Sequence, residues 1–418
     1  QRGAEDNSGG GQVNIRDQDL STSIDHREVL QPSPFQARVD EHGLVQNWMS
    51  WNGYKTARVY DTLASEYFAV RSTCSVMDLT PMEKYRISGP QAKAFLNRLV
   101  TRDISNLKPG RVTYVIWCND EGKVLDDGTL FHLREGDYRL CAQHHQLDWL
   151  LLSSLGFDVS IEHETHEVAA LAVQGPTAFA VLTHAGIADL NVVKPFDNVA
   201  RTLGDIDVMV SRTGFTGDLG YECWVDPKDA LALWDAIFAL KQQGLFDIRP
   251  IGLGALDMVR IEAGFIMPGD DFNTAETAVR ADRDRSPYEL GLGWLVNFDK
   301  PYFTGKQALI AERARTAKRQ LLKLTVEGNK PPQDAFLYDS KNGSRIGTIT
   351  SCVWSPILKT NVTLADVTFT DGEPPSEIWA EIYYQKELEW LATWAKCRIS
   401  EKAFWIHPRS SATPPNNL

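Results

Sequence analysis

Short β-type segments that alternate with a few helical ones are the feature that most restricts the fold of this 418-residue chain. The regular strand–helix–strand repeat of a parallel α/β sheet is missing, so the pattern predicts an α+β fold. A chain of this length is expected to form two or three domains, each with its own core. The segments expected to be strands are YRIS, VTYVIW, TLFHL, YRLCA, VSIEH, VAALAV, DVMVSR, KLTVE and IWAEIYY.

One helix has clear signals at both ends. Asp226 can cap it, Pro227 suits its first turn and Gly244 ends it, which predicts a helix over residues 227–243. Further helices are expected at residues 257–263, after a loop at 252–254, and at residues 304–319.

Composition divides the chain into a body and two polar ends. Residues 1–33 and 403–418 are predicted to be tails, or arms lying on the body, that carry no chemistry. Residues 34–317 are predicted to form the main region, in two subdomains. Residues 318–402 are predicted to form a strand-rich C-terminal domain, in which Asn342-Gly343 marks a hairpin turn.

The formal net charge of -12 argues against nucleic acid as a partner, because phosphate binding relies on clustered Lys and Arg. No apolar run approaches the roughly 18 residues needed to cross a bilayer, so no membrane partner is expected. Six widely spaced cysteines without a CxxC pair indicate reduced thiols. They suit the cytoplasm, or the mitochondrial matrix if a targeting segment was removed ahead of Gln1.

Two histidine motifs raise the question of a metal. In His163-Glu-Thr-His166 the imidazoles would lie on opposite faces of a strand, since positions three apart differ in parity. These two and His144-His145 are interpreted as surface histidines, and no metal ligand is assigned. The signatures GxSxG, HExxH and the P-loop are absent, and the GLG segments lack the third glycine of a dinucleotide turn, which disfavours a nicotinamide enzyme.

Two acidic positions could carry chemistry. Asp126 and Asp127 enter a strand after a turn, where adjacent side chains diverge, so one carboxylate can point inward while the other stays in water. Glu222 shares a strand face with Trp224, where a carboxylate beside an indole could hold a flat ligand with two N–H donors. Taken alone, a solvated turn and an exposed strand glutamate are the simpler interpretations.

Several motifs carry a resemblance to a known family. SRTGFTGDLGYE resembles a family segment SRTGYTGExGYE, and GKVLDDGTLF resembles GGxxDDLxVY. Counterparts in the same order are VAALAVQGP, IGLGALDMVRIEAG, SPYELGLGW, YFTGKQAL and GTITSCVWSPIL. Seven matches in register, from about Phe35 to about Val367, make the chain similar to the aminomethyltransferase family, which includes the T-protein of the glycine cleavage system.

The resemblance implies three subdomains arranged like a clover leaf, ending in a C-terminal β-barrel, with tetrahydrofolate in a central funnel. By motif position, Glu222 looks like the glutamate that binds the 2-amino and N3–H edge of the pterin. Asp127 looks like the catalytic acid near folate N5 and N10. The residues that fall where the family lines this funnel are Tyr114, Met82, Phe215 and Trp294.

Departures from the T-protein pattern bear on the donor. Leu256 replaces the arginine of GLGARD, and the segment at residues 77–82 lacks the histidine of FDVSHM. These changes favour a demethylase-type paralogue that passes a one-carbon unit from a small methylated or aminomethyl donor to tetrahydrofolate. The alternatives are a true T-protein, which would use a lipoylated carrier protein, and a non-catalytic folate-binding iron–sulfur assembly factor. The last is disfavoured because RPIGLGALDM contains no cysteine.

Overall fold

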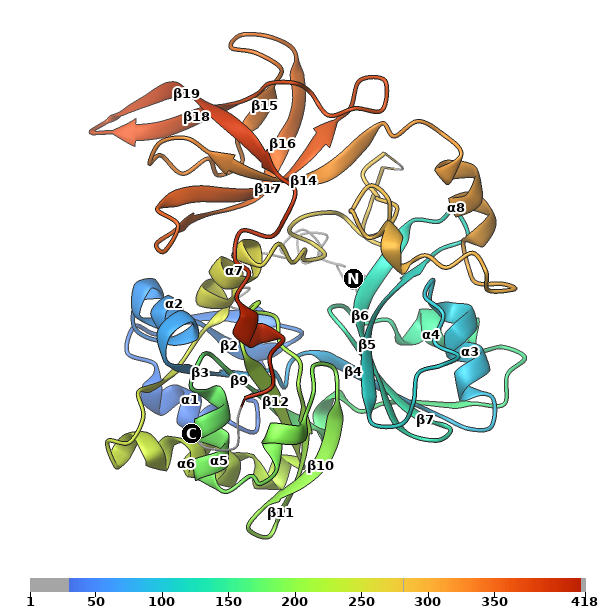
Figure 1. Cartoon of the computed structure of the whole chain (residues 1–418), viewed down its shortest axis with the longest axis vertical. Coiled ribbons are helices and arrows are strands. Elements are labelled where there is room, and N and C mark those ends of the chain that lie inside the picture. Colours follow the sequence, from blue (N-terminus) through green and yellow to red (C-terminus); the bar gives the residue numbers. More distant parts are fainter. Residues whose placement is uncertain (1–29, 281, 415–418) are drawn as a thin grey trace, which may run out of the picture.

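Three groups of strands surround the centre of the molecule in Figure 1. The computed structural model describes residues 30–280 and 282–414, so most of the predicted N-terminal tail lies outside the described residues. A six-stranded sheet forms the first lobe, a five-stranded sheet forms the second, and a closed six-stranded barrel forms the third. The predicted α+β class is confirmed, and each predicted strand segment coincides with a strand.

The first lobe has a mixed sheet in which only the pair at one edge is parallel. In spatial order its strands are β10 (Asn198–Leu203), β11 (Ile206–Ser211), β12 (Gly220–Val225), β9 (Ala169–Gln174), β3 (Cys74–Asp78) and β13 (Ile248–Pro250). Its helices are α1 (Gln36–His42), α2 (Leu63–Ser72), α5 (Ala178–Ala185), α6 (Ala230–Gln242) and α7 (Leu253–Glu262), and a hairpin of β1 (Asn47–Trp51) and β2 (Tyr54–Val59) adds to it. Because side chains alternate along a strand, Tyr221 and Cys223 of β12 join the core under α5 and α6, whereas Trp224 faces the opposite way.

The predicted helix at residues 227–243 is confirmed. A short 3₁₀ turn at Pro227–Asp229 leads into α6, and the carboxylate of Asp226 accepts a hydrogen bond from the backbone N–H of Lys228 at 3.0 Å. Gly244 follows the helix with φ +71°, a conformation that favours glycine over residues with a Cβ.

The second lobe is an insertion between two neighbouring strands of the first. The chain leaves β3, builds the five-stranded sheet and returns as β9, which pairs antiparallel with β3. In spatial order the inserted strands are β5 (Arg111–Cys118), β6 (Val124–Arg134), β7 (Asp137–Ala142), β4 (Glu83–Ser88) and β8 (Ser160–His163). Helices α3 (Ala92–Leu99) and α4 (Leu147–Ser153) pack on one face of this sheet and leave the other face to the first lobe.

The third lobe is the barrel predicted for the C-terminal part. Its strands, in order around the barrel, are β14 (Arg319–Val326), β17 (Thr360–Thr368), β16 (Arg345–Ser355), β15 (Phe336–Tyr338), β18 (Ile378–Lys386) and β19 (Glu389–Ser400). The predicted turn at Asn342-Gly343 joins β15 to β16, and Asn342 adopts φ +59°. The predicted domain limits after residues 33, 317 and 402 stay predictions.

A buried ionic network joins the barrel to the first lobe. Glu262 at the end of α7 accepts hydrogen bonds from Tyr67, Arg71 and Ser355, and the side chains of Arg71 and Glu262 are fully buried. Removing one member of a buried ion pair typically costs about 3–5 kcal/mol, so truncation of Arg71 or Glu262 is expected to destabilise this junction. The C-terminal segment also lies on the body, because Arg409 binds Asp218.

Two helix boundaries differ from the expectation. Helix α7 begins inside the predicted loop at 252–254, since the carboxylate of Glu66 accepts the backbone N–H of Gly252 at 2.8 Å and so serves the helix start. Gly254 lies within this helix, and the position suits glycine because a Cβ there would lie 2.7 Å from the Leu63 side chain. Helix α8 (Lys306–Arg313) is shorter than predicted, since the chain must enter β14 at Arg319.

The six cysteines are all free, and only Cys352 is not fully buried. Within the described residues, no helix combines the length and the apolar character needed to cross a membrane.

Candidate functional site

An apolar cluster fills the space between the two sheets, and it is called the central cluster below. It takes Phe131 from β6 and Trp224 from β12, whose rings meet edge to face with centroids 5.2 Å apart. Leu256 of α7 belongs to the same cluster, so the position where the resemblance expects an arginine is buried and apolar. The facing surfaces of the first and second lobes therefore meet here.

Asp127 lies on the β6 face that carries Phe131, four residues away in the same strand. It pairs with Ile116 of β5, and the hydroxyl of Tyr114, two residues earlier on that strand, donates a hydrogen bond to its Oδ2. Asp126 points to the other side, as predicted from strand parity. The expectation that one of the two acids stays in water is wrong, because Asp126 is fully buried and Asp127 is 9% exposed.

Asp126 is satisfied by backbone donors. Its carboxylate accepts the N–H of Asp127 at 2.8 Å and the N–H of His144 at 2.9 Å. Burial and, second, the charge of Asp126 raise the pKa of Asp127 to about 7, against the opposing hydrogen bond from Tyr114. Asp127 is thereby suited to exchange a proton near neutral pH.

Glu222 lies on the face of β12 that carries Trp224, and it is 9% exposed. The hydroxyls of Ser211 and Thr213 both donate to its Oε2, so the simpler interpretation as an exposed strand glutamate is wrong. Among the described residues, no hydrogen bond to its Oε1 is recorded, which leaves that oxygen to accept from a ligand. Burial raises the pKa of Glu222 to about 6, against the two hydroxyl hydrogen bonds.

The glycines around Glu222 make room for one side chain. A Cβ at Gly214 or Gly220 would lie 2.2 or 2.0 Å from Oε1 of Gln174. The amide of Gln174 donates to the carbonyls of Thr213 and Tyr221, each at 3.2 Å, and so ties the turn to the strand. The glycine-rich corner thus fixes Tyr221, which precedes Glu222 in the strand, and Thr213, whose hydroxyl binds Glu222.

The four residues expected to line a funnel fall into two groups. Met82 and Phe215 are half-buried members of the central cluster, and Phe215 stacks on Phe265 with centroids 5.3 Å apart. Tyr114 and Trp294 form the second group, with ring centroids 6.3 Å apart and Trp294 65% exposed. The first group packs against the central cluster, and the second lies beside Asp127, because the Tyr114 hydroxyl donates to its carboxylate.

Two cavities formed by the described residues lie away from these side chains. One of about 520 Å³ is lined by Tyr54, His166, Lys228 and the segment 31–34. The other, of about 300 Å³, lies between Lys123 and Thr368 near the barrel. Neither is lined by a predicted site residue, so the site is defined here by its contacts.

Sequence reasoning missed three residues of the candidate site and gave Asp126, which it did single out, no role of its own. Asp126 orders the backbone at Asp127, and Ser211 and Thr213 bind Glu222. The alternation of two hydroxyl residues ahead of the glycines was the available signal for the last two. Arg102 lies over the ring of Trp294 at 5.7 Å and donates to the carbonyl of Tyr114, which no local sequence pattern indicates.

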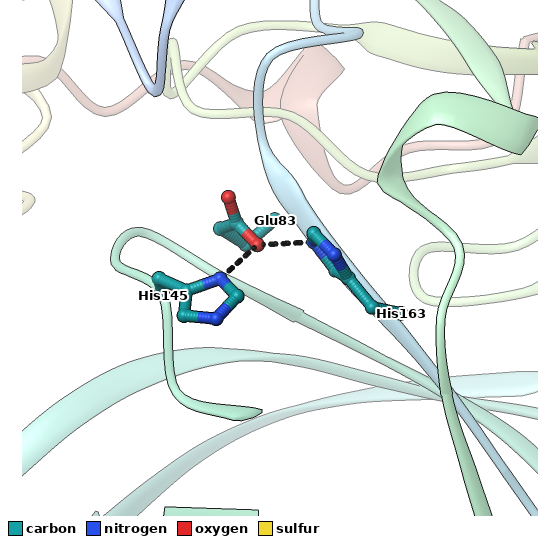
Figure 2. Close-up of side chains that lie close together, drawn as sticks. All are labelled: Glu83, His145 and His163. Atoms are coloured by element: carbon teal, nitrogen blue, oxygen red, sulfur yellow. Dashed lines mark hydrogen bonds and ion pairs between the residues drawn. The ribbon is translucent and has the colours of Figure 1, made fainter. Parts of the chain in front are cut away.

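The histidine motif also differs from the expectation. Strand β8 ends at His163 and a 3₁₀ turn at Thr165–Glu167 follows, so the rings of His163 and His166 lie 5.9 Å apart and not on opposite faces. Figure 2 shows His145 and His163 directed at the same oxygen of Glu83. These histidines are part of a polar cluster, and His163 is only half-exposed.

Comparison with known proteins places the chain in a family. Residues 36–300 match the family model described as the GCVT N-terminal domain. An aminomethyltransferase of Halothermothrix orenii is 30% identical over 335 residues, which cover 79% of this chain and 90% of the relative. An aminomethyltransferase of Desulforamulus reducens is 33% identical over 330 residues, covering 77% and 87%.

A solved structure agrees in fold. The glycine cleavage system aminomethyltransferase T from Bartonella henselae superimposes with a TM-score of 0.77 at 24% identity, over 90% of this chain and 98% of that one. The predicted clover-leaf fold with its C-terminal barrel is confirmed. The chain therefore belongs to the aminomethyltransferase family and is an enzyme of the transferase class.

Proposed function

We propose that the chain transfers an aminomethyl-derived one-carbon unit to tetrahydrofolate, as its relatives' name implies. The observation that carries the proposal is the placement of two buried carboxylates, Asp127 and Glu222, on sheet faces whose aromatic side chains meet in one apolar cluster. Tetrahydrofolate would supply the nitrogens that accept the one-carbon unit. The residues of this chain would bind it, orient it and handle a proton.

Glu222 suits the edge of a pterin. A 2-amino group and an N3–H next to it are two adjacent donors, and a carboxylate with one oxygen free of protein donors can accept from them. Half-buried Phe215 and Met82 offer an apolar surface beside it for a flat ring. The donor set therefore fits the ligand.

Asp127 suits proton transfer. Folate N5 and N10 lose protons when the one-carbon unit is bonded to them, and the raised pKa of Asp127 equips its carboxylate to accept one. Tyr114 holds the carboxylate by a hydrogen bond to Oδ2. Close positioning and exclusion of water supply the remaining rate enhancement.

Arg102 suits the other end of a folate. Its guanidinium lies beside the largely exposed ring of Trp294, and it forms no ion pair with another of the described residues. A cation on an aromatic surface near Asp127 is available for the carboxylates of a glutamate tail.

The relatives also bear on the donor. Sequence departures favoured a demethylase-type donor, but the most similar relatives carry the name aminomethyltransferase. We therefore propose a lipoylated carrier protein bearing an aminomethyl group as the donor. A small methylated donor is the second candidate, supported by buried Leu256 at the family's arginine position.

The test examines the identity of the donor separately from the use of tetrahydrofolate. Purified protein is incubated with tetrahydrofolate and either an aminomethyl-loaded lipoylated carrier or a panel of methylated amines, sulfonium compounds and methoxy-aromatics, and products are read by mass. The proposal expects 5,10-methylene-tetrahydrofolate and ammonia with the carrier. Formation of 5-methyl-tetrahydrofolate from a panel member alone overturns the donor assignment, and absence of tetrahydrofolate binding overturns the proposal as a whole.

A further inference from the structure

Three side chains able to bind a metal converge on the second lobe, on separate chain segments. Glu83 begins β4, His145 lies in the loop between β7 and α4, and His163 ends β8 (Figure 2). One ligand atom from each lies within 4.8 Å of the other two. Glu83 Oε2 is 2.7 Å from His163 Nε2 and 3.3 Å from His145 Nδ1.

We propose that this cluster binds one divalent transition-metal ion of the zinc class. Zinc takes imidazole nitrogens and carboxylate oxygens at about 2.0–2.2 Å, so ligand atoms around a tetrahedral ion lie about 3.3–3.5 Å apart. The contact between Glu83 and His145 already has this spacing, and the contact between Glu83 and His163 needs to open by less than 1 Å. Two imidazoles with a carboxylate favour zinc, copper or nickel over magnesium or calcium.

The hydrogen bonding around Glu83 supports a cation. Three polar groups approach the single atom Oε2 of Glu83: the two imidazoles and the hydroxyl of Tyr85 at 3.1 Å. The hydroxyl of Thr165 lies 3.5 Å from the same atom but only 2.7 Å from Nε2 of His163. A carboxylate oxygen offers about two lone-pair sites, so three approaching groups already exceed what it can accept. A metal ion replaces the two imidazole donors with two ligands and leaves the hydroxyls to orient the carboxylate.

The cluster combines a buried anchor with an open side. The side chain of Glu83 is 8% exposed, that of His163 is 24% exposed and that of His145 is 55% exposed. An ion can therefore enter from solvent, and water can take the fourth position on the side of His145. The backbone N–H of Gln146 donates to the Tyr85 hydroxyl at 2.7 Å, which holds the His145 loop close to Glu83.

The cluster is linked to the candidate site by its loop. The backbone N–H of His144, next to His145, donates to Asp126 at 2.9 Å, and Asp126 in turn accepts from the N–H of Asp127. An ion bound by His145 would restrict the motion of this loop. Through the hydrogen bond of His144 to Asp126, it would also restrict the motion of Asp126 and Asp127. The metal site itself does not depend on the proposed folate chemistry.

The first experiment measures metal binding directly. Full-length protein dialysed against a chelator is titrated with ZnCl₂ by calorimetry, and CoCl₂ is added to follow visible absorption. We expect one ion per chain and cobalt bands typical of low coordination number. The double variant His145→Ala/His163→Ala should lose at least about 10-fold in zinc affinity. Replacing residues that only hydrogen-bond to metal ligands already has an effect of this size. His184→Ala, which alters an exposed histidine of α5, is the matched control and should bind as the wild type does.

Several outcomes overturn the proposal. One is that the wild-type protein binds no zinc. Another is that the double variant binds zinc with wild-type affinity. Glu83→Gln keeps a polar side chain of the same size, so a folded Glu83→Gln protein with undiminished zinc affinity also counts against it.

The second experiment follows the loop by amide hydrogen exchange. Zinc should slow exchange across residues 143–146 in the wild type and leave the double variant unchanged. Equal protection in both proteins would contradict a link between the ion and this loop.

Discussion

Asp127 and Glu222 are buried to the same extent, but different groups contact their carboxylates. Asp127 has a second acid beside it in the chain and a tyrosine hydroxyl, and its pKa is raised to about 7. Glu222 has two aliphatic hydroxyls and no acid in contact, and its pKa is raised only to about 6. Burial is the main cause of both raised pKa values, and at Asp127 the charge of Asp126 adds to it, whereas at Glu222 the two hydroxyl donors oppose it. The comparison indicates that Asp127 is the better suited of the two to proton exchange and Glu222 to accepting hydrogen bonds from a ligand.

The largest expected effect is on the rate of transfer, and it distinguishes the role of Asp127 from that of Glu222. Asp127→Asn should lower the single-turnover rate of transfer by about 10²–10⁴-fold, because a general base is lost, while tetrahydrofolate binding changes little. Rapid-quench kinetics and fluorescence titration measure the two quantities. Asp205→Asn, at an exposed turn, is the control. A variant that loses binding and rate in parallel would remove the distinction between the carboxylates.

The next effect is on affinity. Glu222→Gln should weaken tetrahydrofolate binding by about 10–100-fold, because a charged acceptor is replaced by a neutral one that also donates. At saturating folate the single-turnover rate should stay close to wild type. Glu135→Gln, whose side chain is 75% exposed, is the control. Unchanged affinity would mean that Glu222 does not contact the pterin.

A smaller effect is on stability, and its sign follows from the raised pKa values. Between the ordinary pKa of 3.8 and about 7, folded Asp127 holds more protons than the unfolded chain, so stability falls as pH rises through this window. For Glu222 the window is narrower, from 4.5 to about 6.

Both neutral variants should therefore be more stable than wild type at pH 8. The expected gains in unfolding free energy are about 1–3 kcal/mol for Asp127→Asn and about 1 kcal/mol for Glu222→Gln. The difference from wild type should shrink towards pH 4. Urea unfolding at both pH values measures it, and a gain larger for Glu222→Gln would reverse the comparison.

The smallest effect tests the tyrosine. Transfer should rise with pH through about 7 as Asp127 ionises. Tyr114→Phe removes a hydrogen bond that favours the ionised form, so the rise should move to higher pH by about 0.5–1 unit. A pH–rate profile on single turnovers shows the shift. Movement to lower pH would mean that Tyr114 does not stabilise the carboxylate.

Local sequence patterns correctly predicted the strands and one helix. The predictions that failed concern features that depend on contacts between residues far apart in the chain. The cap at Asp226 acts within one helical turn and was readable. The start of α7 depends on Glu66, almost 190 residues away in the chain, and its glycine serves packing against Leu63. A parity argument failed at His163 because the strand ended there, which depends on the surrounding sheet.

The amino-acid sequence by itself determined the positions of most strands and the family, because these follow from side-chain alternation and from motifs in register, and it singled out Asp127 and Glu222 as candidates. Burial was decided only by the tertiary structure. Asp126 is fully buried because the loop of His144 folds over it, and Glu222 is buried because the second lobe, inserted between β3 and β9, packs against its sheet. A raised pKa is a property of surroundings contributed by distant segments, and no local pattern contains it.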